Sequence, residues 1–561
     1  MRSFRINSIE IIWGSLFTPL RQMEGPGIGC RGHSMVRKGS FYTAAVVVIF
    51  LLSGCVKVGP DYVRPPTAVS PNWLEADDKR VRAEPAEYRA WWEAFNDPVL
   101  NNIINRAYHD NLSLKIVGVR VLQARAQLGI AVGNIYPQTQ QANGELTFNR
   151  ISERSFLGSA SQSASVKFSY WEDQIYLNAA WEIDFWGKFR RAIESADASL
   201  RMSVADYDSA LVTLTADAAN DYIQIRTLQK RLSIARQNVE SQEESVRIAE
   251  DKFKGGLTTL LDVEQAKTSL FSTQSTIPTL EAQLQQTKNA LSVLLGLPPS
   301  SLEDILAGVS DIPAPPPQVA VGIPADLLRR RPDVRSAELQ AVAQCAQIGV
   351  AKADLFPAFS LTGTFGFLST TIGKFKLSDI TSWKARQVTA GPSLQWNILN
   401  YGQITNNVRL QDAKFQELLI TYQNTVLQAQ QEVEDSLAGF LRAQENAGYL
   451  SLTEDAAKRS LNLAVIQYRQ GSTDFTTVLT AQQFLLSTQD NLASAQGNIS
   501  GNLIGLYKAL GGGWEIREGQ DIVSPEIKEV MAKRTNWGQL LSPSTYMPLS
   551  EPVPTIQMPD W

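Results

Sequence analysis

Apolar residues recur every eleven positions in two long stretches of the chain, which follow Gly187 and Gly402. The recurring residues are Phe189, Leu200, Leu211 and Tyr222 in the first stretch and Ile404, Phe415, Val426 and Leu437 in the second. An eleven-residue repeat averages about 3.67 residues per turn, so it predicts nearly straight helices. At about 1.5 Å per residue, stretches of about 67 residues predict rods of about 100 Å.

Each long helix is expected to end in a glycine turn and to be followed by a shorter helix that runs back along it. The turns contain Gly255, Gly256 and Gly471. The returning helices are predicted at about 258–295 and 473–510. Proline lacks the N–H that an interior helical position donates, so we expect a kink or break at Pro278.

A different pattern precedes each long helix. Alanine- and glutamine-rich helices are predicted at about 98–134 and 325–355, and proline ends each of them. Polar and apolar residues then alternate as in strands, at 137–148, 174–186, 359–367 and 388–399. Aromatic residues near the strand ends fit either a packed sheet or a girdle at a membrane interface; they are Tyr170, Trp171, Trp181, Trp186, Trp383, Trp396 and Tyr401.

The two halves of the chain are copies of one unit. "LFSTQ" meets "LLSTQ" at a spacing of about 215 residues, and Trp181 meets Trp396 at the same spacing. Upstream of the strands the spacing is about 220 residues, where Gly129 meets Gly349. The predicted organisation is a first repeat at 98–310, a proline-rich linker at 311–324, a second repeat at 325–513 and a C-terminal tail at 514–561.

An apolar run near the N-terminus predicts export and lipid anchoring. Residues 39–52 are uncharged and follow two basic residues, as in a bacterial signal peptide, so residues 1–54 are interpreted as an upstream extension and a signal that is removed. "LSGC" resembles a lipobox, which predicts acylation of Cys55. Val56 in place of aspartate favours the outer membrane, with 55–97 as a lipidated linker. The alternative is an ordinary signal or a buried helix with a chance cysteine.

The strand count predicts an oligomer. Four strands cannot close a barrel, and an open edge in lipid would leave backbone groups without hydrogen-bond partners. Two chains would pool eight strands, whose interior side chains fill the barrel, whereas three would pool twelve and leave room for a lumen. The sequence therefore favours an oligomer with an open bore.

Composition excludes several kinds of chemistry. The net charge is −4 and no long basic block occurs, which argues against a nucleic-acid partner. Of two histidines only His109 follows the signal, so a multi-histidine metal site is excluded, and we expect His109 to be a partly exposed helical residue. Cys345 has no expected disulfide partner. No phosphate-binding loop occurs, so the chain has no obvious energy source and no cofactor is expected. Because histidine is rare and no nucleophile motif occurs, the protein is predicted not to be an enzyme.

Four segments resemble the TolC-like outer membrane factors, specifically the lipoprotein branch of OprM-like and NodT-like efflux components. They are "WWEAFNDPVLNNIINRAYHDN", "LLRRRPDVRSAE", "FKGGLTTLLDVEQAKTSL" and "YRQGSTDFTTVLTAQQFL". The resemblance covers about Cys55–Gly513; the second turn lacks the usual Leu-Asp pair, and the tail is unfamiliar. It implies an α+β membrane protein, a homotrimer with a twelve-stranded transmembrane β-barrel continuous with a long α-helical periplasmic barrel.

The resemblance also implies a function. The chain would be the outer membrane channel of a tripartite efflux system, anchored in outer membrane lipids, extending into the periplasm and passively conducting drugs or other small molecules. Its partners would be a periplasmic adaptor and an inner-membrane pump, commonly of the resistance-nodulation-division class. The alternatives are a lipidated periplasmic adaptor or another structural lipoprotein, and a secreted hydrolase that the shortage of histidine disfavours.

By analogy with the family, control and adaptor contact are expected at the two helix turns. The turn residues are Gly255, Gly256, Gly471, Ser472 and Thr473. Asp262 and Asp474 are the nearest acids, and three copies of either could form a cation-binding ring on the axis. The alternative is helix capping by Thr258 or Thr259 and by Thr473 or Asp474. Arg329–Arg331 are interpreted as surface charges ahead of a helix that begins with proline.

Overall fold

A computed structural model describes residues 57–82, 84, 88–152, 154, 169–308, 311–324, 330–372 and 375–542. The chain divides into two units, Met1–Cys55 and Val56–Trp561, and only the second contains described residues. The expected signal and Cys55 therefore lie outside the described residues, as does Arg329.

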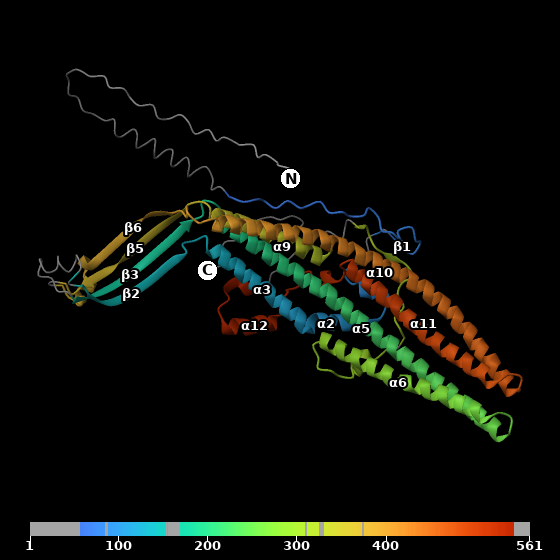
Figure 1. Cartoon of the computed structure of the whole chain (residues 1–561). Helices are drawn as coiled ribbons and strands as arrows, with labels where there is room; N and C mark the ends of the chain where they lie inside the picture. Colours follow the sequence, from blue (N-terminus) through green and yellow to red (C-terminus); the bar gives the residue numbers. More distant parts are fainter. Residues whose placement is uncertain are drawn as a thin grey trace, which may run out of the picture. The chain divides into compact units, whose positions relative to one another are not determined.

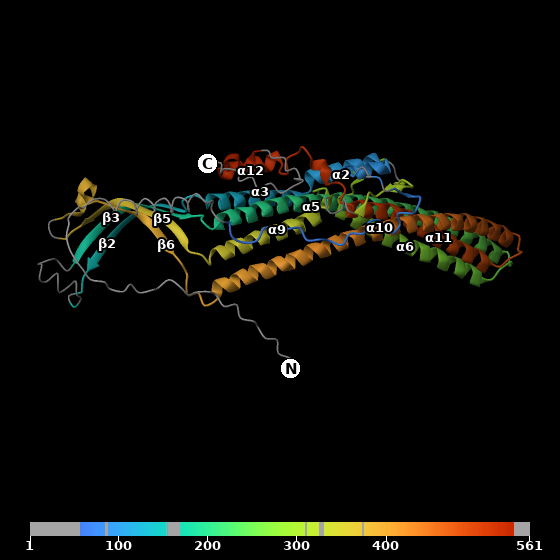
Figure 2. The ribbon, with the colours of Figure 1, turned by 90° about the horizontal axis from the view of Figure 1, so that it is seen from above.

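One antiparallel sheet lies at one end of the long helices (Figures 1 and 2). Its order is β2-β3-β5-β6, with β2 at Thr139–Arg150, β3 at Ser169–Ile183, β5 at Ala358–Thr370 and β6 at Arg386–Gln395. All four predicted strands are confirmed, with ends shifted by a few residues. The outer strands β2 and β6 each pair on one side only among the described residues, so the sheet has two open edges.

The same order of elements occurs twice (Figure 1). The first set is α3 (Leu112–Gly133), β2, β3, α5 (Lys188–Lys254) and α6 (Leu260–Leu294). The second set is α9 (Pro332–Ala353), β5, β6, α10 (Gln403–Arg469) and α11 (Phe475–Ala509). Both long helices have 67 residues, which confirms the length predicted for the two stretches that follow Gly187 and Gly402.

The tryptophans at the strand ends hold the junctions between helix and sheet. The indole N–H of Trp181 donates to the Ile135 carbonyl oxygen at 3.0 Å, and that of Trp396 donates to the equivalent Leu355 oxygen at 3.1 Å. Both carbonyls follow the end of a helix, where backbone acceptors lack intrahelical partners. The repeated contact explains why tryptophan stands at both positions, and both rings remain partly exposed, as a membrane girdle would require.

Two helix predictions were wrong in detail. The predicted helix 98–134 is two helices, α2 (Pro98–Asp110) and α3, which Asn111 separates. The Asn111 side chain accepts from the Leu114 N–H at 2.7 Å, because asparagine competes for backbone donors and favours a cap. Of the kink or break expected at Pro278, the break is wrong, since α6 is continuous through this residue, and the kink stays a prediction. Pro278 is exposed, so water can reach the carbonyl that its ring leaves without a donor.

The main apolar core lies half-way along the helices, where the short elements gather. These elements are η1 (Trp91–Phe95), α2, α7 (Glu303–Leu306), the pair β1 (Val81–Arg82) and β4 (Val319–Ala320), η4 (Trp514–Arg517), α12 (Pro525–Arg534) and η5 (Gly538–Leu541). Their apolar side chains pack on α5, α10 and α11 around Tyr222, Phe440 and Leu503, which are fully buried. The described part of the C-terminal tail is thus a component of the core.

An extended N-terminal segment, residues 57–75, runs from the base of the sheet along α9 and α10 (Figure 2). It begins where the Val58 N–H donates to the Trp186 carbonyl oxygen at 3.1 Å. Further along, Arg64 forms a bidentate pair with Glu338 of α9, at 2.6 and 2.8 Å. The segment therefore connects the sheet end of the molecule to its central core.

Among the described residues one helix, α3, is long and apolar enough to cross a membrane by length and composition. It packs along α5, with Leu114, Val121 and Leu122 buried. Core helices pass the same test, so this observation is weak evidence for a membrane span.

Candidate functional site

The two hairpin turns have the same backbone geometry. Gly256 and Gly471 both have positive φ, 67° and 77°. The N–H of Leu257 donates to the Lys252 carbonyl oxygen, and that of Ser472 donates to the Gln467 oxygen, each at 2.9 Å. This pattern caps the last helical carbonyls and favours glycine at the left-handed position. The adaptor-contact residues predicted from sequence therefore lie in two equivalent turns at the end of the helices away from the sheet (Figure 1).

An apolar cluster joins the two hairpins near these turns. Its members are Ala249, Val263 and Ala266 of the first hairpin and Ala464, Tyr468, Phe475 and Val478 of the second. The rings of Tyr468 and Phe475 meet edge to face at 5.3 Å, and the Lys252 ammonium lies 4.1 Å from the Tyr468 ring centroid. The tips of the two hairpins are therefore in direct contact within one chain.

The two candidate gate acids have different surroundings. Asp262 is partly buried in the first turn of α6, where the Thr258 hydroxyl donates to its carboxylate. Burial raises the pKa of Tyr468, the Thr258 hydroxyl lowers it, and the nearby Asp262 carboxylate raises it. Asp262 thus belongs to the contact between the hairpins.

Asp474 is exposed and takes the N-cap position of α11, but its side chain makes no capping hydrogen bond. Thr259 likewise occupies the N-cap of α6 without a side-chain bond. Thr473 donates to the Thr477 hydroxyl at 3.0 Å and also caps nothing. Asp474 and Thr259 thus occupy the predicted N-cap positions without a capping hydrogen bond, and the Asp474 carboxylate is exposed beside the turn.

Polar contacts continue the junction between the hairpins toward the centre of the molecule. Arg231 of α5 forms a bidentate pair with Asp490 of α11, at 2.7 and 3.0 Å. Asn238 donates to Gln489 at 2.9 Å, one heptad further toward the turn. We call this α5–α11 junction the intrachain seam.

The two copies differ in how their long helices are covered. α5 contacts both α3 and α9, whereas α10 contacts α9 and α11 and has, among the described residues, no second helix in the place that α9 takes on α5. Large apolar side chains are about half exposed along α10, namely Leu410 at 51%, Ile420 at 56% and Leu427 at 53%. The equivalent α5 residues are buried at 6%, 3% and 6% exposure; they are Ser195, Ala205 and Val212. One flank of α10 thus lacks the cover that α5 has.

The helices α3 and α9 also differ in how closely one flank is packed. On α9, Gly349 packs so closely that a Cβ there would lie 2.8 Å from the Arg191 Cγ atom. Its equivalent on α3, Gly129, has nothing within 4 Å of the same point. The residues equivalent to Arg191 and Gly349 are Asn406 and Gly129, and these two are therefore not in contact within the chain.

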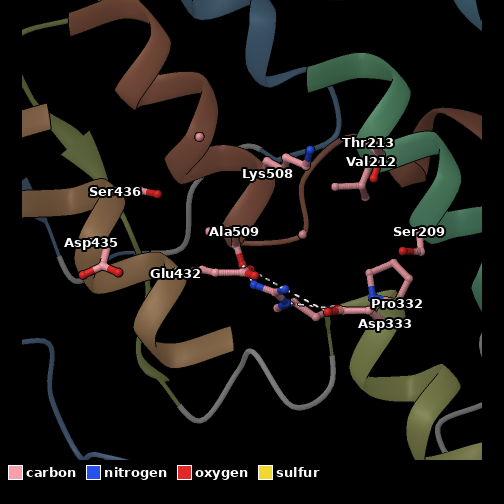
Figure 3. A pocket seen from close by; sticks show the side chains of 13 residues that line it. Ser209, Val212, Thr213, Pro332, Asp333, Glu432, Asp435, Ser436, Lys508 and Ala509 are labelled. Carbon is pink, nitrogen blue, oxygen red and sulfur yellow. Dashed lines mark hydrogen bonds and ion pairs between the residues drawn. The ribbon is translucent and has the colours of Figure 1, made fainter. Parts of the chain in front are cut away.

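A cavity of about 410 Å³ lies between α5, α9, α10 and α11 (Figure 3). Arg331 is buried in its wall at 7% exposure and pairs with Asp333 and Glu432, at 2.8 and 2.7 Å. Arg331 also donates to the Ala509 carbonyl oxygen at the end of α11, and Arg330 donates to that of Leu510. The surface interpretation of these two arginines was wrong: the last carbonyls of α11 need donors, and guanidinium groups supply them.

Nothing in the described residues forms a catalytic arrangement around the remaining candidates. His109 is exposed in the last turn of α2, with Nδ1 2.8 Å from the Asn105 carbonyl oxygen, which confirms the helical interpretation. Cys345 is a free, buried thiol, and burial raises its pKa to about 11. No group of three metal-ligating side chains occurs in the part of the chain that the structure describes.

Comparison with known proteins identifies the family. The family described as "Outer membrane efflux protein" matches residues 103–297 and 323–512, which together make up most of the chain. The chain belongs to the outer membrane efflux protein family. It is 31% identical to Nodulation protein T of Rhizobium leguminosarum bv. viciae over 505 residues, which cover 90% of this chain and 100% of that protein.

Further relatives agree with this assignment. The pyoverdine export outer membrane protein OpmQ of Pseudomonas aeruginosa is 30% identical over 442 residues, 77% of this chain and 89% of OpmQ. The solved outer-membrane channel OprN has a TM-score of 0.74 at 31% identity and covers 82% of this chain and 99% of its own. As an outer membrane efflux protein, this chain is an outer membrane component of an efflux system and has the fold of these channels.

Proposed function

We propose that this outer membrane efflux protein is a homotrimer whose chains close one continuous tube. The observation that carries the proposal is how the first repeat joins the second within one chain. α5 of the first repeat packs on α9 of the second, and β3 pairs with β5. The same two junctions, repeated once more, would join α10 to α3 and β6 to β2 of the next subunit.

Each open surface described above is half of such a junction. The exposed stripe on α10 and the open site at Gly129 would cover one another, and the β2 and β6 edges would pair. Twelve pooled strands enclose a lumen, whereas eight would fill with side chains. Three chains are therefore the smallest ring that supports a conduit, a transmembrane β-barrel continuous with an α-helical barrel.

Substrate would move passively through this bore, driven by the partners. We propose a periplasmic adaptor bound at the hairpin turns and an inner-membrane pump of the resistance-nodulation-division class, which supplies drugs or other small molecules. The two glycine turns at the free end of the helices support the adaptor contact. The family match and the likeness to a solved channel support a channel role without enzymatic activity over the adaptor and hydrolase alternatives.

We assign the closing ring to Asp474 and a structural role to Asp262. The Asp474 carboxylate is exposed beside the turn, so three copies could meet on the axis and bind cations. Asp262 instead lies against Thr258 and Tyr468 between the hairpins of its own chain.

Cross-linking tests the trimer. Cysteines at Gly129 and Asn406 occupy the positions equivalent to Gly349 and Arg191, which are in contact, and Cβ atoms about 4 Å apart can form a disulfide. We expect oxidation of the double variant to give covalent dimers and trimers on non-reducing gels. Cys345 should not interfere, because its thiol is buried.

The matched control combines Gly129→Cys with Asp412→Cys, an exposed residue on another face of α10, and should stay monomeric on the same gels. Single-channel conductance in planar bilayers checks the conduit directly. Purified protein that remains monomeric, forms no cross-link and conducts no current would contradict the proposed function.

Lipid anchoring at Cys55 gives a separate prediction. Lys57, which follows the predicted acylation site Cys55 by two residues, packs against Gly187 at the base of the sheet and pairs with Glu194 at 2.6 Å. Acyl chains there would enter the membrane beside the barrel. We expect Cys55→Ser to abolish incorporation of labelled palmitate into the protein, and retained label in that variant would exclude this site.

A further inference from the structure

The two ends of the chain cover equivalent places on the two repeats. In the first repeat the C-terminal tail crosses α3. A Cβ at Gly118 would lie 2.9 Å from the Ile522 carbonyl oxygen, and Arg125, about two turns nearer the sheet, donates to the Leu540 carbonyl oxygen at 2.9 Å. We call residues 522–541, which include α12 and η5, the tail strap.

In the second repeat the N-terminal segment crosses α9 at the same two positions. Glu338 and Cys345 stand 220 residues after Gly118 and Arg125. Glu338 pairs with an arginine of the N-terminal segment at 2.6 Å, and the Cys345 thiol donates to the Pro60 carbonyl oxygen at 3.6 Å. The two terminal segments run in opposite directions, yet each covers the same place on the short helix of its repeat.

The N-terminal segment joins three helices. On one side of α9, Arg191 of α5 donates to the carbonyl oxygens of Val58 and Gly59, both at 3.1 Å. On the other side of α9, Gln430 of α10 donates to the Ala68 carbonyl oxygen at 3.0 Å. The segment therefore ties the long helix of the first repeat to the long helix of the second, across the junction between the repeats.

The tail makes only half of the corresponding contacts within its own chain. Asp208 of α5 pairs with Arg517 of the tail at 3.0 Å, and the residue equivalent to Asp208, Gln423 of α10, donates to the Pro66 carbonyl oxygen of the N-terminal segment at 3.3 Å. On the other side of α3, no helix among the described residues takes the place that α5 has beside α9. α12 lies on this side, past α3 and away from α5 (Figures 1 and 2).

In the proposed trimer, α10 of the neighbouring subunit takes this place. Its residues Asn406 and Arg409 are equivalent to Arg191 and Glu194 of α5. Arg191 holds the N-terminal segment as described, and Glu194 pairs with Lys57 of the same segment at 2.6 Å. Asn406 and Arg409 are both exposed in the chain, so the face of α10 that would meet a terminal segment is uncovered.

We propose that the tail strap joins neighbouring subunits, with η5 packed on the neighbour's α10 beside Asn406 and Arg409. This inference rests on the proposed trimer. The partly buried Leu541 of η5 and the half-exposed Leu410 of α10 supply apolar area for the contact. The N-terminal segment covers the junction within each chain, and the tail strap covers the equivalent junction between chains, so every junction around the ring is tied by one chain end. This contact lies beyond residue 512, where the family match ends.

Cross-linking with a short bismaleimide tests the contact. Gln539 of η5 is exposed, so we expect Gln539→Cys with Arg409→Cys to give covalent dimers and trimers on denaturing gels. The matched control is Gln539→Cys with Leu427→Cys. Leu427 is also exposed and lies on the same face of α10, five turns or about 27 Å further from the sheet, so this pair should stay monomeric.

A single substitution tests how the tail strap is held. Arg125→Ala removes the donor to the Leu540 carbonyl oxygen, so we expect a several-fold loss of the cross-linked product and a lower temperature of trimer dissociation on gels. Arg120→Ala removes an exposed arginine from the same helix and should change neither. Circular dichroism of both variants verifies that the subunits remain folded. Equal effects of the two substitutions would contradict the proposed anchoring of the strap.

The outcomes separate the strap from the trimer. If the pair at 539 and 409 gives no oligomers, or only a product of monomer size, while the disulfide pair at 129 and 406 does form oligomers, the strap is overturned and the trimer stands. If both pairs fail and the unmodified protein is monomeric and conducts no current, the proposed function is overturned together with this inference.

Discussion

Asp208→Ala is expected to lower the free energy of unfolding by about 3–5 kcal/mol, the usual result of removing one partner of a buried ion pair. The Asp208 carboxylate is 1% exposed and accepts from Arg517 of the tail and Arg335 of α9, each at 3.0 Å through one oxygen. Without it, the guanidinium groups of Arg517 and Arg335 lose the buried carboxylate that both of them contact. Thermal unfolding of the detergent-solubilised protein, followed by circular dichroism, measures the loss.

Two comparisons isolate the cause of this loss. Asp217→Ala removes a partly exposed carboxylate from the same helix, whose partner Lys508 lies at 3.3 Å, and should cost about 0–1 kcal/mol. Replacing both Asp208 and Arg517 by leucine and methionine should recover part of the stability, because apolar residues can substitute for a buried pair. An Asp208→Ala variant as stable as Asp217→Ala would show that the pair contributes little.

The elements with a strong period could be predicted from the sequence. The eleven-residue spacing indicated two helices, the glycines at their ends indicated the length of α5 and α10, and alternation indicated the four strands. The duplication was visible in the sequence because both copies keep residues that have the same role. Trp181 and Trp396, for example, donate to equivalent backbone carbonyl oxygens. Local features of this kind need no knowledge of distant contacts.

The errors arose where distant segments decide a residue's role. Arg330 and Arg331 have the composition of a surface run, yet they donate to carbonyls at the end of α11, about 180 residues away. Asn111 ends α2 because its side chain can cap α3 and also reach the Leu294 carbonyl oxygen. A run of arginines or a single asparagine gives no local signal for such partners.

The candidate site could be predicted only in part from the sequence, for the same reason. The glycines of the turns follow from the left-handed conformation that the turns require. The choice between Asp262 and Asp474 could not be made from spacing, because both lie close to a turn. The neighbouring side chains distinguish them: Asp262 is partly buried and accepts from Thr258, whereas Asp474 is exposed.

Asp474→Ala is therefore expected to raise the conductance of the resting channel. Three carboxylates on the axis would bind cations and hold the turns together, and losing about 1 kcal/mol of closing free energy would raise the open population about fivefold. Since the Asp474 side chain caps no helix, the substitution should leave folding and assembly unchanged. Asp251→Ala, which removes an exposed acid from the other hairpin, is the matched control for single-channel recordings in planar bilayers. A normally assembled Asp474→Ala trimer with the conductance of the control would place the closing ring elsewhere.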